Sequence, residues 1–331
     1  MNASGSRLVT IFGGSGFVGR HTVRTLAAQG WRVRVACRRP DLAYHLQPLG
    51  RPGQIHAVQA NLRHPASVAA ALRGSDAVIN LAGILNEKGR QNFAAVHAFG
   101  ARTIARAANE AGVPALVHMS ALGADSASAS SYARSKAEGE EAVLDSFASA
   151  RIVRPSIIFG PEDDFFNRFA ALARIAPVMP LIGGGQTRFQ PVYVGDVAAA
   201  IAELAGGGGS DGATYETGGP EVKTFEELLR YICEVTERNR LFVPAPWMLA
   251  NVKAFSLEMI SKLSLGLWPD WLLFTRDQIK LLKQDNVVSS RAIAEGRTLP
   301  RLGIQPEAIS AHVPGYLYRF RKTGQFENQS A

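Results

Sequence analysis

The sequence predicts a doubly wound parallel α/β sheet followed by a smaller, mostly helical C-terminal lobe. Over the first 155 residues, short apolar strands alternate with amphipathic helices, which is the order of a parallel sheet built from βαβ units. The strands are apolar without interruption, as in a sheet that is covered on both faces. A glycine-rich turn also lies directly between the first strand and the first helix. Together these observations predict an α/β fold of the Rossmann type.

The expected elements run in order along the chain. Val18, Thr22 and Leu26 recur at helical spacing, whereas Val33 and Val35 alternate as in a strand. On such patterns we expect strands at 7–12, 32–37, 54–59, 77–81, 115–120 and 151–155, and helices at 17–29, 65–72, 92–111, 132–147 and 164–174. The predicted domains are a first domain over 1–160, to which segments of about 189–220 return, and a C-terminal lobe over 161–331.

Composition excludes several classes of protein. With 47% hydrophobic and 19% charged residues among 331, the chain can form a core and is not a disordered protein. Cys37 and Cys233 are too few for a disulfide framework or a metal cluster; they fit a reducing compartment, or two small buried side chains. The net charge of +8 favours an anionic partner, such as a phosphate cofactor, anionic lipid, nucleic acid or an acidic subunit, without choosing among them. Of these, nucleic acid is not expected, because the sequence has no helix-turn-helix or finger pattern.

One region differs from the rest in composition. Residues 244–284 carry Trp247, Trp268 and Trp271 among many leucines, with Lys or Arg at intervals. This composition is typical of a helix pair on a membrane surface or in a protein groove, and also of an amphipathic helix that caps the C-terminal lobe. No apolar run is long enough to predict a transmembrane helix, and the first residues lack the pattern of a signal peptide.

The turn after the first strand has the spacing Gly13-x-x-Gly16-x-x-Gly19. The first glycine permits a tight turn, the second lets the backbone approach a pyrophosphate, and the third lets helix and strand pack closely. Helix N–H groups then face the phosphates, whose charge the helix dipole favours. The sequence therefore predicts a nucleotide site, with contacts from Gly13, Ser15, Gly16, Phe17, Val18 and Gly19.

The end of the second strand indicates which nucleotide is bound. A carboxylate there would accept hydrogen bonds from the ribose of NAD, but this strand ends in Arg38 and Arg39. Guanidinium groups suit a 2′-phosphate, so the sequence predicts NADPH; two solvated arginines are the alternative. Asn61 can offer its amide to the base edge, and a tight turn after the fourth strand lets the cofactor cross the strand ends. The contacts predicted here are Asn61, Leu62, Leu81, Ala82 and Gly83.

Tyr132 and Lys136 are four residues apart, which places both on one face of a helix. A lysine beside a phenol lowers the pKa of the phenol and can bind the ribose of a nicotinamide. The phenol can then act as a general acid or base at a carbonyl. The pair is therefore a candidate catalytic or cofactor-binding pair.

In these motifs the chain resembles the extended or atypical branch of the short-chain dehydrogenase/reductase superfamily. The glycine turn, NLAG (80–83), the Tyr132/Lys136 pair, RPSIIFGP (154–161) and FQPVYVGDVA (189–198) carry the resemblance. It implies a Rossmann fold over residues 7 to about 220. It also implies cofactor contacts from Ser120, Pro155, Ser156 and Ile157, the last three near the nicotinamide.

The chain departs from the active members at two positions. Leu122 stands where they carry a catalytic serine or threonine. Ser120 comes too early in the chain to take that role. A different register of the segment would be needed for one of the later serines to supply the hydroxyl, namely Ser126, Ser128, Ser130 or Ser131. His97 stands where they carry an asparagine, either as a new function or as a structural histidine. Loss of a hydroxyl that polarises a carbonyl usually costs orders of magnitude in rate. The pattern therefore predicts bound cofactor with weak turnover or none.

Over nearly its whole length the chain resembles the dehydrogenase-like accessory subunits of respiratory complex I, the NADH:quinone oxidoreductase. The matching stretches include IFGGSGFVGRH (11–21), CRRP (37–40), YARSKAEGE (132–140) and RPSIIFGPEDDFFNRFA (154–170). The resemblance implies tightly bound NADPH, with other complex I subunits and anionic lipid as partners. It implies a position peripheral to the inner membrane, on the cytoplasmic face in a bacterium or the matrix face in a mitochondrion.

Three functions stay open at this point. The first is a non-catalytic accessory subunit that holds NADPH as a structural ligand. The second is an active NADP-dependent reductase or epimerase that uses Tyr132 and Lys136. The third is a regulator whose affinity for a partner changes with the redox state of the nucleotide. The absent hydroxyl at Leu122 and the composition of residues 244–284 favour the first.

Overall fold

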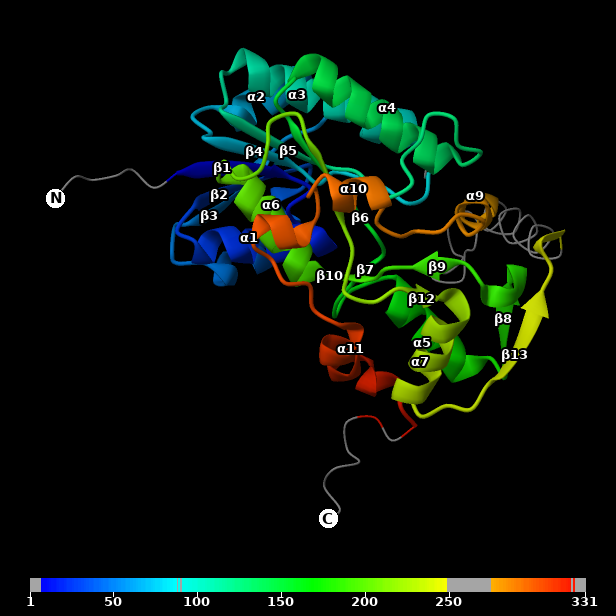
Figure 1. Cartoon of the computed structure of the whole chain (residues 1–331). Helices are drawn as coiled ribbons and strands as arrows, with labels where there is room; N and C mark the ends of the chain where they lie inside the picture. The colour runs from blue at the N-terminus through cyan, green and yellow to red at the C-terminus, as the bar shows by residue number, and fades with distance from the viewer. Residues whose placement is uncertain (1–6, 88, 90, 249–274, 323, 325–331) are drawn as a thin grey trace. The chain divides into compact units, whose positions relative to one another are not determined.

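The structure is a computed structural model that describes residues 7–87, 89, 91–248, 275–322 and 324 (Figure 1). The chain divides into two units, between which it passes after residues 155, 193, 217, 287 and 306. The first unit contains Met1–Pro155, Val194–Thr217 and Val288–Pro306, and the second contains Ser156–Tyr193, Gly218–Val287 and Glu307–Ala331.

A seven-stranded parallel sheet forms the centre of the first unit, in the order β11-β6-β5-β4-β1-β2-β3. This confirms the predicted Rossmann-type fold. The strands are β1 (Leu8–Phe12), β2 (Arg32–Cys37), β3 (Ile55–Gln59), β4 (Ala77–Asn80), β5 (Ala115–Met119), β6 (Arg151–Pro155) and β11 (Thr214–Thr217). The strand order reverses between β1 and β4, and ligands of open α/β sheets bind beyond the carboxyl ends of strands at such a point.

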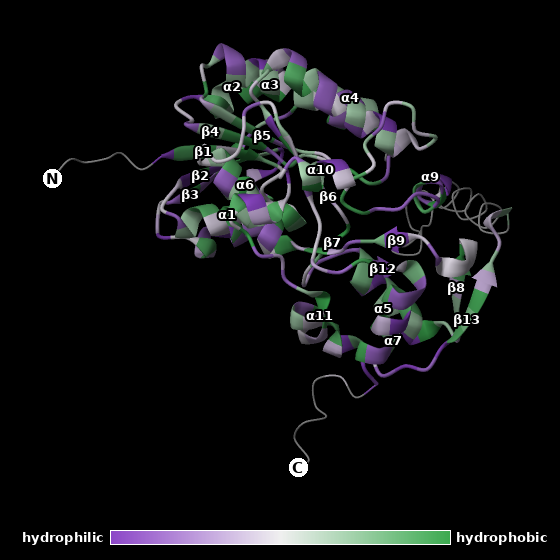
Figure 2. Ribbon diagram, in the orientation of Figure 1, coloured by the Kyte–Doolittle hydropathy of each residue, from purple (hydrophilic) through white to green (hydrophobic). Residues whose placement is uncertain are grey.

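Helices cover both faces of this sheet (Figure 1). One layer consists of α1 (Phe17–Ala28) and α6 (Val194–Ala205), which pack against each other. The other consists of α2 (Pro65–Leu72), α3 (Gly100–Glu110) and α4 (Ser131–Ser146). Beneath this second layer, strand residues such as Leu116 and Ile152 pack with Ile104 and Val143 of the helices. Figure 2 shows hydrophilic residues interleaved with hydrophobic ones on α3 and α4, as expected of helices with one buried face.

The predicted helix at 92–111 is in fact two elements. A π-helical turn, η2 (Ala94–Phe99), precedes α3. Gly100 at the junction allows a close approach, since a Cβ there would lie 2.8 Å from the Leu62 side chain. A 3-10 helix, η1 (Pro40–Leu49), also forms where no element was expected, and it begins at a proline.

The second unit is a lobe of helices and two-stranded pairs. Its core joins aromatic and aliphatic side chains of α5 (Phe165–Ile175), α7 (Phe225–Val235) and α11 (Ile309–Leu317). The strand pairs are β7 (Ile158–Phe159) with β10 (Val192–Tyr193), β9 (Arg188–Phe189) with β12 (Lys223–Thr224), and β8 (Val178–Ile182) with β13 (Leu241–Ala245). The helix α9 (Arg276–Leu281) begins at a capping box formed by Thr275 and Gln278.

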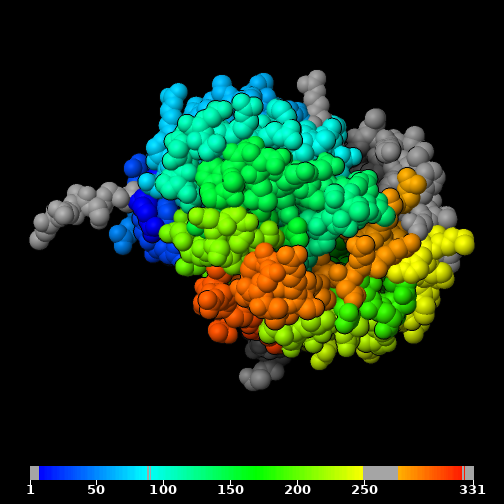
Figure 3. Space-filling model, turned by 45° about the horizontal axis from the view of Figure 1, so that its top comes forward, coloured from blue at the N-terminus to red at the C-terminus, as the bar shows by residue number. Residues whose placement is uncertain are grey.

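The structure places Val288–Pro306 in the first unit, whereas the sequence analysis assigned it to the C-terminal lobe. This segment contains α10 (Ser290–Ala294) and the 3-10 helix η5 (Leu299–Leu302), which contacts α6 and β11. In Figure 3 its orange surface lies against the yellow-green surface of Val194–Thr217. Polar contacts hold it there, because the Glu216 backbone N–H donates to the Arg297 carbonyl at 3.0 Å.

Most of the tryptophan-rich segment 244–284 lies outside the described residues, including Trp268 and Trp271. The described parts are its two ends, at residues 244–248 and 275–284. Among the residues that the structure describes, no helix is both long enough and apolar enough to span a bilayer.

Candidate functional site

The glycine turn has the geometry that its spacing predicts. Gly13 has φ +79°, and a Cβ there would lie 2.8 Å from the Leu81 carbonyl, so this position requires glycine. A Cβ at Gly19 would lie 2.4 Å from the Gly13 oxygen, so only glycine lets α1 approach the turn this closely. Gly16 is less crowded, since a Cβ there would meet only the Gly13 oxygen, at 3.3 Å.

The N-terminus of α1 is suited to an anion. Gly16 is the N-cap residue, no side chain caps the helix, and no acidic residue lies in its first turn. The first N–H groups of the helix are therefore not satisfied by a capping side chain, and the helix dipole adds partial positive charge. Val18 is buried and faces the interior, and Phe17 contacts His21 edge-on.

The turn after β4 packs directly on the glycine turn. The Leu81 N–H donates to the Phe12 carbonyl at 2.8 Å, and the Ala82 N–H donates to Asn80 Oδ1 at 3.1 Å. Asn80 and His118 are paired in register on β4 and β5, so their side chains meet. Because Asn80 Oδ1 accepts from Ala82, its amide nitrogen donates to His118 Nδ1, at 3.0 Å. A buried polar pair thus fixes the turn that carries three predicted cofactor contacts.

His97 fixes the next residue of that turn. Its Nε2 accepts from the Ile84 N–H at 3.1 Å, so the ring proton is on Nδ1, which lies 2.8 Å from Ser135 Oγ. Ser135 Oγ in turn donates to the Tyr132 carbonyl at 2.8 Å. Burial and the nearby Lys136 ammonium lower the pKa of His97 to about 3. His97 is therefore a neutral structural link, with both ring nitrogens engaged.

Tyr132 and Lys136 do lie on one side of α4, with the Lys136 Nζ 5.8 Å from the centroid of the Tyr132 ring. Desolvation raises the pKa of Tyr132 to about 12, so the expectation that Lys136 lowers it is wrong. Lys136 is buried, its pKa is lowered to about 8 by desolvation, and its ammonium donates to the Met119 carbonyl at 3.3 Å. Phe93 and His97 complete the packing around Tyr132 with edge-on ring contacts.

The residues after β5 include Leu122, the position where the resemblance implies a catalytic hydroxyl. Leu122 is buried and forms a small apolar cluster with Val288 and Ala292. Three of the serines that could replace its hydroxyl have other contacts: Ser130 caps α4, Ser128 Oγ accepts from the Ser130 N–H, and Ser131 Oγ accepts from the Arg134 guanidinium at 3.1 Å. The Ser120 hydroxyl is buried without a hydrogen-bond partner among the described residues.

The two arginines after β2 are not equivalent. Arg39 is held by Asp41 through two nitrogens, at 3.0 and 2.7 Å. The exposed Arg38 guanidinium forms no ion pair within the described part of the chain. Asn61 Oδ1 accepts from the Arg63 N–H at 3.1 Å, which orients its amide nitrogen away from that turn. Leu62 packs on the core beside Gly100.

The three residues predicted near the nicotinamide fall in both units. Pro155 ends β6 in the first unit, whereas Ser156 and Ile157 begin the second. Ser156 Oγ lies 2.7 Å from Asn286 Oδ1, and the Ile157 carbonyl accepts from the Val192 N–H at 2.9 Å.

Sequence reasoning missed three polar side chains that support the site: Asn80, His118 and Ser135. A polar residue within an otherwise apolar strand was the available signal for Asn80 and His118, and the i+3 spacing from Tyr132 was the signal for Ser135. The described residues include no group of three or more His, Cys, Asp or Glu side chains placed to hold a metal ion.

The parallel sheet, the glycine turn at a bare helix N-terminus and the Tyr132–Lys136 pair define a short-chain dehydrogenase/reductase fold. The model of the NAD dependent epimerase/dehydratase family matches residues 9–215. The chain belongs to that family and, within it, to the group of the alpha subcomplex subunit 9 of NADH dehydrogenase (ubiquinone).

The chain is similar to several known proteins, of which three are described here by their identity and coverage. The mitochondrial alpha subcomplex subunit 9 of Arabidopsis thaliana is 36% identical over 96% of this chain and 79% of its own length. A ceramide reductase of Caulobacter vibrioides is 37% identical over 59% of each chain. The NADPH complex of the quinone oxidoreductase QOR2 from Escherichia coli has a TM-score of 0.69 over 94% of this chain and 99% of its own. Its 20% identity makes that a likeness of fold alone.

Proposed function

We propose that this chain is a non-catalytic accessory subunit of respiratory complex I that holds NADPH as a structural ligand. One observation carries the proposal: the glycine cradle and the uncapped helix N-terminus suit a dinucleotide. Leu122, which is buried in an apolar cluster, stands where the family resemblance implies a catalytic hydroxyl. The buried, unpartnered Ser120 hydroxyl also fits a bound ligand. A ligand that binds only the folded state stabilises it by mass action, which gives NADPH a role without turnover.

The residues that would hold the nucleotide can be assigned from their positions. The turn Gly13–Gly19 would bind the pyrophosphate through backbone N–H groups, and Arg38 would bind the 2′-phosphate. Asn61 would face the adenine, and the turn at Leu81, Ala82 and Gly83 would support the riboses. Lys136 would contact the ribose of the nicotinamide. When bound, the nicotinamide supplies hydride chemistry, for which this chain lacks the hydroxyl donor.

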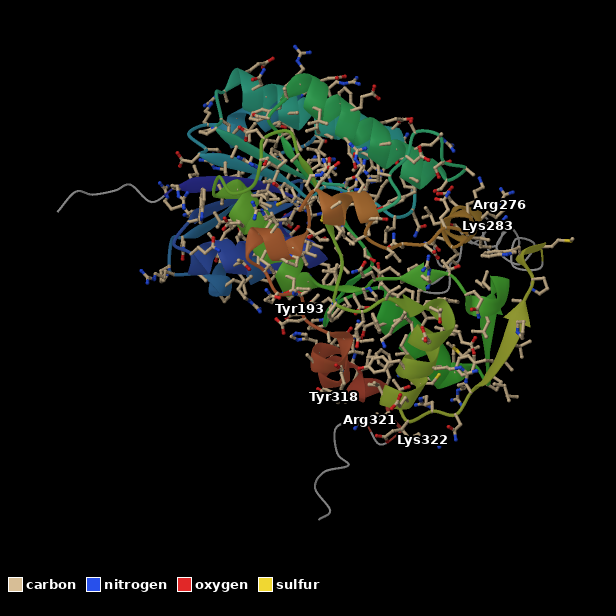
Figure 4. All side chains as sticks on the ribbon, viewed as in Figure 1. Tyr193, Arg276, Lys283, Tyr318, Arg321 and Lys322 are labelled. Carbon is tan, nitrogen blue, oxygen red and sulfur yellow. The ribbon has the colours of Figure 1, made fainter. Side chains whose placement is uncertain are left out.

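Other complex I subunits and anionic lipid are the partners that fit this function. The two described ends of segment 244–284 lie together, since the Lys283 Nζ is 5.5 Å from the ring centroid of Trp247. Arg276 and Lys283 project from the same part of the second unit (Figure 4), and Met248 is 78% exposed. Basic and large apolar side chains side by side suit the surface of an anionic membrane. The proposed location is peripheral to the inner membrane, on its cytoplasmic face in a bacterium or its matrix face in a mitochondrion.

The first test is co-purification from membranes. We expect the tagged chain, solubilised in mild detergent, to elute with NADH:quinone reductase activity and to release NADPH on denaturation. The control for adventitious nucleotide is chain that is purified on NADP⁺-agarose and kept apart from membranes. Elution of the chain alone from the soluble fraction, without nucleotide, would contradict the proposal.

The alternative is an active NADP-dependent reductase or epimerase. The placement of Tyr132 and Lys136 on one side of α4 favours it, as does the similarity to a ceramide reductase. This alternative requires that the chain turn over a carbonyl substrate. It also requires that Tyr132→Phe abolish this turnover and leave NADPH binding unchanged. The raised pKa of Tyr132, about 12, makes it a poor proton donor at neutral pH.

The preference of the site for NADPH over NADH gives a second prediction, which concerns Arg38. We expect Arg38→Ala to weaken NADPH binding by ~10–100-fold, the value of one charge-assisted contact, and to leave NADH binding within ~2-fold. Titration calorimetry with both nucleotides measures this. Arg39→Ala is the matched control and should have the smaller effect, because Asp41 already holds that guanidinium. Equal losses for NADPH and NADH in Arg38→Ala would count against a 2′-phosphate contact.

A further inference from the structure

The turn that joins α7 to β13, residues 236–240, lines a hollow in the second unit, which we call the arginine hollow. Its volume is about 520 Å³. Arg238, Asn239 and Arg240 of the turn line it together with Phe242 and the last turns of α7. All of these residues belong to the second unit, whereas the glycine turn belongs to the first. The arginine hollow is therefore a candidate site of its own.

A Schellman motif fixes the start of this turn. The Glu237 N–H donates to the Glu234 carbonyl, and the Arg238 N–H donates to the Cys233 carbonyl, both at 2.9 Å. Glu237 has φ +55°, in the left-handed region where such a motif usually has glycine. Its carboxylate lies 3.2 Å from the guanidinium of Arg321, which Figure 4 labels. The Glu237 carboxylate is therefore engaged by Arg321 and not by the arginine next to it in the turn.

Backbone carbonyls, not carboxylates, orient the two guanidinium groups of the turn. Arg238 donates through Nε and Nη2 to the Phe320 carbonyl, at 3.0 and 2.9 Å. Arg240 donates through Nε to the Ala173 carbonyl at 2.6 Å and through Nη1 to the Asn239 carbonyl at 3.0 Å. Each guanidinium thus has a fixed direction and keeps its full charge. Arg238 Nη1 and Arg240 Nη2 have no hydrogen-bond partner within the described residues, so each can donate to a ligand.

The carboxylates near the arginine hollow do not balance its guanidinium groups. Arg230 also lines it, but Arg230 pairs with Glu226 at 2.7 Å. Glu234 is the one lining carboxylate that forms no ion pair within the described part of the chain. It stands against two guanidinium groups, those of Arg238 and Arg240. The lining therefore keeps an excess of positive charge.

A third guanidinium group adds to this charge from the end of α5. Arg174 is exposed, and desolvation lowers the pKa of Arg238, as do the charges of Arg240 and Arg174. These cations repel one another, and an anion bound among them would remove that repulsion. A phosphate group suits them, because its oxygens can accept from several guanidinium donors at once. The volume also has room for the group to which the phosphate is attached.

We propose that the arginine hollow binds a phosphate group, which Arg238 and Arg240 contact and whose charge Arg174 helps to balance. Two sources share this chemistry: a soluble phosphate monoester and the head group of an anionic phospholipid. The proposal does not rest on NADPH binding, because every residue of the hollow lies in the second unit. It adds a second anion site to the one expected at the glycine turn.

Calorimetric titration with inorganic phosphate tests the site directly. At constant ionic strength, and with NADPH in excess at the glycine turn, we expect a Kd of ~1 mM, the affinity of two charge-assisted contacts. Arg240→Gln removes one contact and should weaken binding by ~10-fold or more. Arg174→Gln removes charge alone and should weaken binding by ~3-fold, whereas Glu234→Gln should strengthen it by ~3-fold.

Arg106→Gln is the matched control, because Arg106 is exposed on α3 of the first unit and its loss lowers the net charge equally. It should leave the Kd for phosphate unchanged. Arg174→Gln keeps the test decisive where Arg240→Gln does not fold, since Arg174 is exposed and forms no ion pair within the residues that the structure describes.

Co-sedimentation with phosphatidylcholine vesicles, with and without phosphatidic acid, distinguishes the two sources. Binding to phosphatidic acid that Arg240→Gln and Arg174→Gln both weaken would identify a lipid head group. Binding of inorganic phosphate that they weaken, without a change in co-sedimentation, would identify a soluble phosphate monoester. If neither variant weakens either kind of binding, the proposal is overturned, and NADPH that still binds would leave the proposed function standing.

Discussion

Gly19→Ala is expected to abolish stable NADPH binding. A Cβ at this position would lie 2.4 Å from the Gly13 oxygen and 2.6 Å from the Gly14 backbone, and neither is a flexible side chain that can move aside. The N-terminus of α1 must therefore shift away from the turn. Loss of two phosphate contacts at the helix N-terminus corresponds to ~100-fold or more in Kd. Overpacking of this kind also costs ~1–3 kcal/mol of stability.

Two measurements separate these effects. Calorimetric titration of NADPH gives the loss of affinity, and thermal unfolding without nucleotide gives the loss of stability. Gly315→Ala is the matched control, because Gly315 lies within α11 at negative φ and a Cβ there would meet no atom within 4 Å. It should stabilise the chain by ~0.5–1 kcal/mol and leave NADPH binding unchanged. Gly19→Ala chain that binds NADPH like the wild type would mean that the glycine turn is not the nucleotide site.

Most of the first unit could be predicted from local sequence. The apolar runs of β1, β4 and β5 are too short for helices, and β2 alternates as a strand does. Gly13 and Gly19 stand where backbone contacts leave no room for a Cβ. These features depend on residues close together in the chain. Local pattern therefore predicted both the sheet and the turn that carries the candidate site.

The remainder depends on tertiary contacts that no local pattern encodes. Asn80 and His118, which are 38 positions apart, meet because β4 and β5 pair in one particular register. The hydrogen bond between Ser156 and Asn286 joins residues 130 positions apart. His97, within the π-helical turn η2, likewise has its two hydrogen-bond partners in distant segments, after the β4 turn and on α4. Such contacts become visible only in the folded chain.

The two buried histidines predict that the first unit is unstable in acid. His97 and His118 are each 2% exposed, and each accepts a hydrogen bond through its unprotonated nitrogen. Desolvation, with Lys136 nearby, lowers the pKa of both to about 3 from 6.5. Between these values the unfolded chain binds more protons than the folded chain, so stability rises with pH and is lost as pH falls from 6.5. The loss is ~1.4 kcal/mol per pH unit for each histidine, or ~4 kcal/mol in total by pH 5.

Urea unfolding from pH 7.5 to 4.5, followed by circular dichroism, measures this slope. His97→Asn combined with His118→Asn should flatten it, although the double variant is less stable at neutral pH. His56→Asn, at an exposed histidine, should leave it unchanged. The buried Asp163 of the second unit acts in the opposite sense: desolvation raises its pKa to about 6, so its effect on stability becomes less favourable as pH rises from 4 to 6. A slope equally steep in the double variant would show that other groups cause the acid instability, and that the neutral state of His97 and His118 is not required for folding.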